Sequence, residues 1–150
     1  MSRPMQPPPF RFLRLDHVVL RARDVGTLLA FYRDTLGCPL ERSNAELGLY
    51  QLRAGDSLID LVDVAGPLGA AGGAPPGLAG GNVDHVCLRI EPFDPGAISA
   101  WLEAAGIDQE PVATRYGADG FGPSIYLRDP EGNRIELKGP PEARAAGVRP

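Results

Sequence analysis

The only two histidines of this 150-residue chain occupy the same position of a repeated segment. His17 lies in LDHVVLR and His85 lies in VDHVCLR, and five of the seven positions are identical. An imidazole binds divalent metal ions and exchanges a proton near neutral pH. A single histidine on a strand is more often structural, but a matched pair favours a shared chemical role.

A carboxylate recurs in the same way near the end of each half. The segments LIDLV and RIELK share the pattern Ile-acid-Leu, which places Asp60 and Glu136 at equivalent positions. Side chains of a strand alternate between its two faces, so each acid points away from the apolar residues beside it. Two imidazoles and one or two carboxylates suit Fe, Mn, Co, Ni or Zn. We therefore expect a divalent metal site built from His17, Asp60, His85 and Glu136.

The elements that must position these residues form one unit that occurs twice. In the first half, alternating apolar residues predict a strand over 13–20, and a capped apolar periodicity predicts a helix over 23–37. Three extended segments follow at 39–43, 48–54 and 57–64. Together they make a βαβββ unit.

The second half repeats this order. A strand is predicted over 83–90, a helix over 94–106, a short extended piece near 110–114 and a hairpin over 122–139. Neither half closes its own core easily, so the two sheets are expected to pair with each other or with a second chain. The predicted organisation is a tail at 1–11, a first module at 12–64, a Gly/Pro-rich linker at 65–82, a second module at 83–139 and a C-terminal tail at 140–150.

Composition and charge exclude several classes of protein. Hydrophobic residues make up 43% of the chain, and no apolar run approaches the roughly 20 residues that span a bilayer. The formal net charge is −4, and the scattered arginines form no basic stripe for a nucleic-acid partner. Cys38 and Cys87 form no C-x-x-C pair, and the N-terminus lacks the apolar stretch of a secretory signal. We expect a reduced, cytoplasmic protein without a membrane partner.

Four segments together resemble the recurring segments of the vicinal oxygen chelate superfamily: LDHVVL, FYRDTLG, VDHVCLRI and SIYLRDPEGNRIEL. This superfamily includes glyoxalase I, extradiol dioxygenases, fosfomycin-resistance enzymes, methylmalonyl-CoA epimerase and bleomycin-binding proteins. The resemblance covers about 13–139. It implies an α+β fold of two tandem βαβββ modules that form curved mixed sheets with helices on the convex face.

The resemblance also implies roles for particular residues. His17, His85 and Glu136 match the positions most often used as metal ligands, and Asp60 matches the position where glyoxalase I has a fourth ligand, usually Glu. Aspartate is one methylene shorter, which leaves open whether Asp60 coordinates the metal. In this superfamily the site often forms between modules of different chains. We therefore expect a homodimer, with the site either within one chain or across its interface.

The implied activity is that of a glyoxalase-like lyase or isomerase, which chelates the vicinal oxygens of a small substrate at the metal. Glu136 or Asp60 would then move the proton. The alternatives are an Fe(II) extradiol-type dioxygenase and an antibiotic-resistance or ligand-binding protein of the same fold. Arg115, Tyr116 and Tyr126 are candidate substrate contacts. The first two lie in ATRYGADGFGPS, which is either a mobile lid or a plain hairpin connection.

Overall fold

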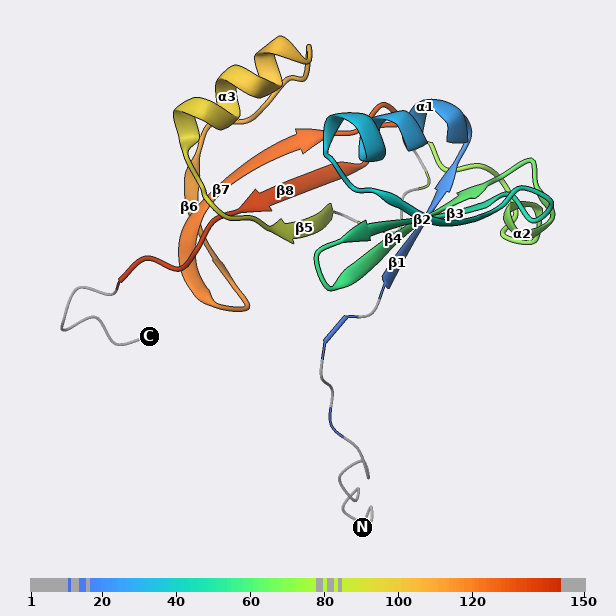
Figure 1. Cartoon of the computed structure of the whole chain (residues 1–150), viewed down its shortest axis with the longest axis horizontal. Coiled ribbons are helices and arrows are strands. Elements are labelled where there is room, and N and C mark those ends of the chain that lie inside the picture. Colours follow the sequence, from blue (N-terminus) through green and yellow to red (C-terminus); the bar gives the residue numbers. More distant parts are fainter. Residues whose placement is uncertain are drawn as a thin grey trace.

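The computed structural model describes residues 11, 14–15, 17–77, 80, 83 and 85–143 (Figure 1). These residues form two four-stranded sheets, one from each half of the chain, with the orders β1-β4-β3-β2 and β5-β8-β7-β6. In both sheets the first and last strands of the module are parallel neighbours, and the other pairs are antiparallel. The predicted α+β fold of two βαβββ modules is therefore confirmed.

The first module follows the predicted order with small shifts at its ends. Its elements are β1 His17–Ala22, α1 Val25–Ala30, a π-helical turn Phe31–Thr35, β2 Leu40–Asn44, β3 Leu49–Ala54 and β4 Ser57–Asp63. The predicted helix over 23–37 is thus an α-helix that continues as a π-helix. Asp24 caps it, because its carboxylate accepts a 3.0 Å hydrogen bond from the backbone N–H of Thr27.

The second module repeats the first after a linker that carries a short helix of its own. The elements are α2 Pro67–Ala70, β5 His85–Arg89, α3 Pro95–Ala104, β6 Ala113–Gly117, β7 Gly120–Arg128 and β8 Arg134–Lys138. Arg21 holds the linker against β1 by donating to the backbone carbonyls of Gly69, Gly73 and Ala74 at 2.8–3.0 Å. The composition of the linker did not predict α2. Most of the two predicted tails, 1–10 and 144–150, lies outside the described residues.

The two parallel strand pairs repeat the same register, which supports an origin by internal duplication. Each histidine opens its first strand, and the residue two positions later lies opposite the carboxylate of the last strand. The paired residues are His17–Leu58 and Val19–Asp60 in the first sheet, and His85–Arg134 and Cys87–Glu136 in the second.

The hydrophobic core is one cluster that both modules share. The residues on either side of each carboxylate belong to it: Ile59 and Leu61 in β4, and Ile135 and Leu137 in β8. In Figure 1, α1 and α3 lie on one side of the sheets, and the helix residues Leu28 and Leu102 are fully buried in this core. Asp60 and Glu136 therefore lie on the opposite, polar faces, as the strand alternation predicted.

Trp101 on α3 lies outside this core. Helical spacing with Ile98 and Leu102 predicts that it is buried, but 39% of its surface is exposed. Leu102 takes the position on α3 that faces the core, and Trp101 lies one residue away at the margin of that face. Among the described residues, no helix is long and apolar enough to cross a membrane.

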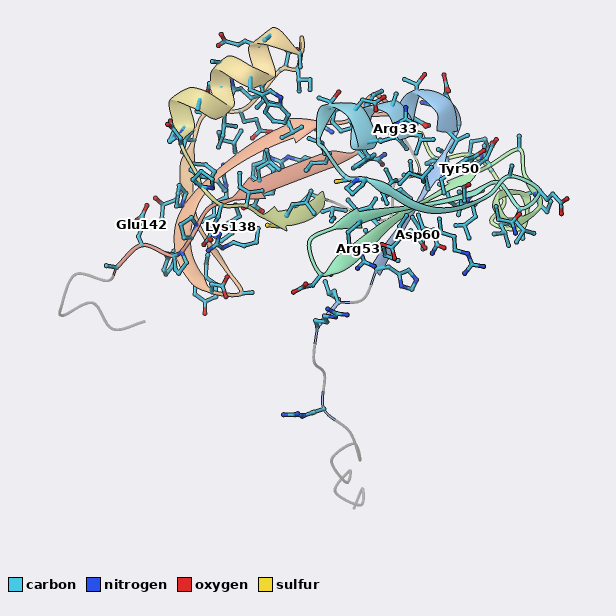
Figure 2. The ribbon with its side chains drawn as sticks, viewed as in Figure 1. Arg33, Tyr50, Arg53, Asp60, Lys138 and Glu142 are labelled. Atoms are coloured by element: carbon cyan, nitrogen blue, oxygen red, sulfur yellow. The ribbon has the colours of Figure 1, made fainter. Side chains whose placement is uncertain are left out.

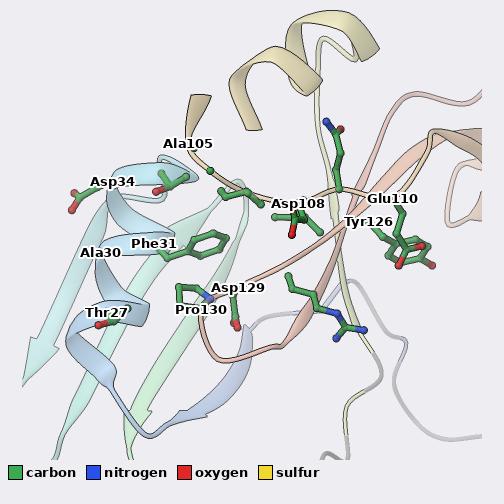
Figure 3. A pocket seen from close by; sticks show the side chains of 16 residues that line it. Thr27, Ala30, Phe31, Asp34, Ala105, Asp108, Glu110, Tyr126, Asp129 and Pro130 are labelled. Carbon is green, nitrogen blue, oxygen red and sulfur yellow. The ribbon is translucent and has the colours of Figure 1, made fainter. Parts of the chain in front are cut away.

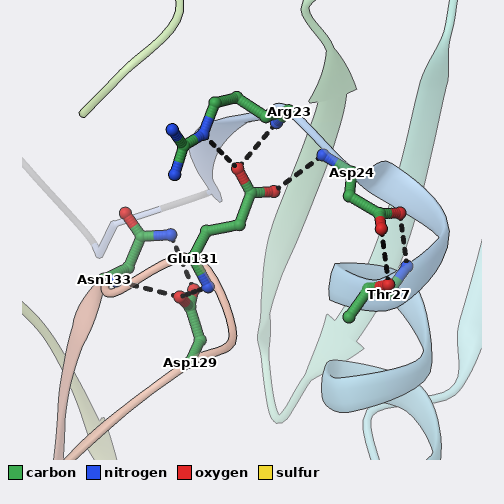
Figure 4. Close-up of polar contacts among 6 residues, drawn as sticks. All are labelled: Arg23, Asp24, Thr27, Asp129, Glu131 and Asn133. Atoms are coloured by element: carbon green, nitrogen blue, oxygen red, sulfur yellow. Dashed lines mark hydrogen bonds and ion pairs between the residues drawn. The ribbon is translucent and has the colours of Figure 1, made fainter.

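The turn of the last hairpin fastens the second module to the first (Figure 4). The Glu131 carboxylate accepts hydrogen bonds from the backbone N–H groups of Arg23, at 2.7 Å, and Asp24, at 3.2 Å. Its side chain also lies 3.6 Å from the Arg23 Nε atom. This carboxylate satisfies donors at the start of α1, where a negative charge is favourable. The turn thus fixes where the first helix begins.

Asp129 makes a second connection from the same turn. It accepts hydrogen bonds from the backbone N–H groups of Glu131 and Asn133, both at 2.9 Å, and from the Asn133 side chain. Its Oδ2 atom also accepts from the Tyr32 hydroxyl of the first module. Burial raises the pKa of Asp129, and these hydrogen bonds oppose the rise. The family-like segment DPEGN is therefore a junction between the modules.

Candidate functional site

The second sheet holds a histidine and a carboxylate in direct contact. Glu136 on β8 is 5% exposed and lies between Cys87 on β5 and Tyr126 on β7. Its Oε2 atom is 3.2 Å from the Nε2 atom of His85. Its Oε1 atom is buried and has no hydrogen-bond partner among the described residues. One oxygen of this carboxylate is thus available to a ligand.

The groups around Glu136 are held in their protonated forms. Burial first, and then the charge of Glu136, raises the pKa of the Cys87 thiol to about 11. The same two causes raise the pKa of the Tyr126 hydroxyl. The ring of Tyr126 meets the ring of His85 edge to face, with 5.3 Å between their centroids. Both groups can therefore donate a hydrogen, and neither adds negative charge beside Glu136.

The first sheet holds a matching carboxylate. Asp60 on β4 is 4% exposed and lies between Val19 on β1 and Gln51 on β3. The Gln51 side-chain amide donates a 3.1 Å hydrogen bond to Asp60 Oδ2, whereas Oδ1 is buried without a partner in the described part of the chain. His17 is exposed at the start of β1. Gln51 was not singled out from the sequence, although it lies opposite Asp60 as Tyr126 lies opposite Glu136.

These residues form two half-sites, which we name by their sheets. The second half-site is His85 and Glu136, and the first is His17 and Asp60. Within the described residues of one chain, no three His, Cys, Asp or Glu side chains come close enough to hold a metal ion. Figure 2 shows Asp60 on the side of the first sheet away from α1, and Lys138 on the other sheet. The expected set of four ligands is not assembled within a single chain.

The donor atoms nevertheless fit a divalent cation. Buried polar atoms are nearly always paired, because an unpaired one costs free energy. Both half-sites break this rule at one carboxylate oxygen, Asp60 Oδ1 and Glu136 Oε1. Carboxylate oxygen and imidazole nitrogen together suit a first-row transition metal. The structure thus contains the ligand types for such an ion, divided between two sheets.

The predicted substrate contacts divide between the two faces of the second sheet. Arg115 and Tyr126 lie together on the face of Glu136, with the guanidinium carbon 4.4 Å from the ring centroid. Tyr116 is the next residue on β6, is 70% exposed, and its ring meets that of Phe121 in an edge-on contact instead. Successive strand residues point to opposite faces, so the two neighbours cannot both line one site. The segment 113–124 forms the β6–β7 hairpin, which was one of its two expected forms.

A separate cleft lies where the two modules meet (Figure 3). Its volume is about 700 Å³, and it is open to solvent along α1 and the loop after α3. Several of its lining side chains are acidic, among them Asp34, Asp108 and Glu110. Asp34 pairs with Arg33, and Glu110 pairs with Arg134. Two of these three acids are thus paired with arginines, and neither half-site carboxylate lines the cleft.

The chain is similar to known proteins over most of its length. A family model described as the Glyoxalase/Bleomycin resistance protein/Dioxygenase superfamily matches residues 14–137. Virulence protein STM3117 of Salmonella typhimurium is 30% identical over 124 residues, which cover 83% of this chain and 82% of that protein. Its crystal structure aligns with a TM-score of 0.72 over 87% of this chain and 99% of its own.

Two further structures indicate the range of functions on this fold. Lactoylglutathione lyase from Agrobacterium tumefaciens is 26% identical, with a TM-score of 0.59 over 89% of this chain and 95% of its own. TnmS3, an antibiotic binding protein from a Streptomyces species, is 22% identical, with a TM-score of 0.62 over 87% of this chain and 98% of its own. At 22% identity, the similarity to TnmS3 concerns the fold alone. From the family model and the paired βαβββ modules, the chain belongs to the Glyoxalase/Bleomycin resistance protein/Dioxygenase superfamily.

Proposed function

We propose that this protein is a glyoxalase-like, metal-dependent enzyme with lyase or isomerase chemistry, which acts on a small substrate with two neighbouring oxygen atoms. One observation carries the proposal: each sheet buries a carboxylate with one unpaired oxygen, at the same register beside a histidine strand. Duplication explains the matched positions, but it does not explain why two costly buried oxygens are both retained without partners.

The residues that would hold the ion are His17, His85, Glu136 and Asp60, and the ion is one of Ni, Zn, Co, Mn or Fe. An ion held by these residues would supply Lewis-acid polarisation of two oxygens on adjacent substrate carbons, which would make the proton on the hydroxyl-bearing carbon more acidic. Imidazole binds a metal only in its neutral form. The 3.2 Å contact between His85 Nε2 and Glu136 Oε2 brings two of these candidate ligand atoms together on the second sheet.

The carboxylates would move the substrate proton. Glu136 or Asp60 takes it from one carbon and returns it to the next, a step that typically contributes about 10²–10⁴-fold. Gln51 holds one oxygen of Asp60 and leaves the other to react. Tyr126 donates towards Glu136 or towards a substrate oxygen from the same face. Each half-site thus combines a carboxylate with a hydrogen-bonding side chain on the neighbouring strand, Gln51 opposite Asp60 and Tyr126 opposite Glu136.

We further propose that the site is completed in a homodimer. The two half-sites lie on different sheets and do not meet among the described residues of one chain. A second copy would bring the first half-site of one protomer to the second half-site of its partner. This arrangement gives two equivalent sites per dimer, and each would contain two imidazoles and two carboxylates.

The likeness to lactoylglutathione lyase favours lyase chemistry over the alternatives. An extradiol-type dioxygenase would use Fe(II) on the two histidines and Glu136, with Asp60 held back by Gln51. It would also need an acid–base side chain, and Tyr126 is the group beside Glu136 that offers one. A ligand-binding role like that of the antibiotic binding protein TnmS3 requires no reacting carboxylate.

An exchange experiment separates these functions. The protein is loaded with each ion in turn and incubated with hydroxyacetone in deuterated water, and loss of the proton signal next to the hydroxyl is followed by NMR. The proposed chemistry predicts exchange that Glu136→Gln abolishes. Oxygen-dependent ring opening of catechol by the Fe(II)-loaded protein would instead support the dioxygenase function. A bound ion with neither reaction would leave a binding protein.

A further inference from the structure

The second sheet concentrates positive charge in a chain whose formal net charge is −4. Glu136 is the only acidic residue in the four strands β5 to β8. The same strands carry five cationic side chains. They are Arg89, Arg115, Arg128, Arg134 and Lys138. By strand alternation all five share the polar face of Glu136. Such a surface attracts an anion, and a divalent ion at Glu136 would strengthen the attraction.

Acidic partners compensate only part of this charge. Arg134 pairs with Glu110 at 3.0 Å, and Arg89 pairs with Glu91 at 2.9 Å. Arg115 instead donates to the hydroxyl of Ser124 at 2.8 Å and to its carbonyl oxygen at 3.2 Å. No carboxylate in the described part of the chain lies within ion-pair distance of Arg115. Its charge is therefore left for a group from outside the sheet.

The position of Arg115 is fixed relative to Glu136. Its guanidinium carbon lies 4.4 Å from the ring centroid of Tyr126, and Tyr126 lies opposite Glu136 on the neighbouring strand. Arg134 approaches the same ring at 3.8 Å from the other flanking strand. Arg115 is thus one aromatic ring away from the carboxylate of the second half-site.

Lys138 fixes the backbone that carries Arg115. Its buried ammonium group donates to the carbonyl oxygen of Arg115 at 2.5 Å and to that of Gly122 at 3.3 Å. A Cβ at Gly117 would lie 2.5 Å from Lys138 Cε, so glycine at this position leaves room for the lysine stem. A guanidinium held in place loses less entropy when it binds, which favours affinity.

We infer that the substrate carries a carboxylate group in addition to its two neighbouring oxygens, and that Arg115 binds this carboxylate. The inference rests on the proposed function, since the neighbouring oxygens are those held at the second half-site. The planar fork of arginine matches a carboxylate, and a charge-assisted pair of this kind is about twice as strong as a neutral hydrogen bond. The carboxylate therefore selects the substrate and orients it towards Glu136.

Two simple acids test this inference. Malate and 2-hydroxybutyrate share a four-carbon chain and the same 2-hydroxy acid unit. At the far end of the chain, malate carries a second carboxylate where 2-hydroxybutyrate carries a methyl group. Each is titrated by calorimetry into the Zn²⁺-loaded protein and into Arg115→Gln, Arg115→Lys and Arg33→Gln. Arg33→Gln removes the same charge from an exposed residue outside the sheets and serves as the matched control.

The wild-type protein and the Arg33→Gln control should bind malate at least about tenfold more tightly than 2-hydroxybutyrate. Arg115→Gln should lose this preference while its affinities for Zn²⁺ and 2-hydroxybutyrate stay unchanged. Arg115→Lys should keep only part of the preference, because it keeps the charge without the fork. Equal binding of the two acids by the wild type, or a preference that survives Arg115→Gln, overturns the inference and leaves the metal site standing. Failure of the wild type to bind any of Ni, Zn, Co, Mn or Fe instead defeats the proposed function, together with the inference built on it.

Discussion

The Tyr32 hydroxyl donates a 3.0 Å hydrogen bond to Asp129 Oδ2, which joins the helix of the first module to the last hairpin of the second. Tyr32 is 1% exposed, and Asp129 is also buried. Burial, followed by the charge of Asp129, raises the pKa of the Tyr32 hydroxyl, so it remains a donor. Together with Glu131, this bond sets how the two modules lie against each other, and hence how the two half-sites are presented.

Removing the Tyr32 hydroxyl should destabilise the whole chain. Tyr32→Phe keeps the ring but leaves one acceptor position of buried Asp129 empty, so the free energy of unfolding should fall by about 1 kcal/mol. Urea denaturation measures this change. Tyr116→Phe is the matched control, since that ring is exposed and its change should be close to zero. Equal effects of the two substitutions would mean that the bond does not join the modules.

Glu131→Gln should weaken the second connection of the same turn. The amide keeps one acceptor for the backbone N–H groups of Arg23 and Asp24 but loses the charge that favours a helix start. The expected loss of stability is about 1 kcal/mol, measured by thermal unfolding. Glu103→Gln, an exposed change on α3, serves as the control. A smaller loss for Glu131→Gln than for this control would argue against the connection.

Gly122→Ala should disturb the end of the second sheet. A Cβ at this position would lie 2.5 Å from the carbonyl oxygen of Pro140, so backbone atoms must move. We expect a loss of about 1–3 kcal/mol in the free energy of unfolding, as for overpacking in a core. A Cβ at Gly77 meets nothing within 4 Å, so Gly77→Ala should be nearly neutral. If Gly122→Ala were equally neutral, the close approach of the two segments would be refuted.

Mixing two inactive variants tests whether two chains share each site. If each site is shared between two chains as proposed, His17→Ala and His85→Ala should each remove every site from their own homodimer. In a mixed dimer, one site combines the intact His85 of the first variant with the intact His17 of the second. Unfolding and refolding an equal mixture should therefore restore metal binding to about a quarter of the wild-type sites, since half of the dimers are mixed and each holds one intact site. Refolding each variant alone is the control, and no recovery in the mixture would contradict a site that two chains share.

The face of the sheet on which each of the two carboxylates lies was predictable from a short-range sequence pattern. In the pattern Ile-acid-Leu, the acid must point away from the core when the Ile and Leu on either side of it are buried in the core. The structure confirms this for Asp60 and Glu136. The helix cap at Asp24 follows from an equally local rule. Such features depend only on residues close in the sequence.

Long-range features were not predictable in the same way. That Tyr126 and Gln51 lie beside the carboxylates depends on the register of β7 with β8 and of β3 with β4. That the half-sites lie apart depends on tertiary contacts such as that between Tyr32 and Asp129, which are 97 residues apart in the sequence. Trp101 shows the same limit, because helical spacing alone does not fix which neighbour faces the core.

The most direct test of the account is the metal content of protein purified without chelator, measured by elemental analysis beside His85→Ala and Glu136→Gln. The proposed metal site predicts about one divalent ion per chain in the wild type and a large loss in both variants. Asp60→Asn separates a four-ligand site from a three-ligand site, since only the former loses affinity with this change. The absence of metal from the wild type after reconstitution with each of Ni, Zn, Co, Mn and Fe, or undiminished metal in His85→Ala, would contradict the account.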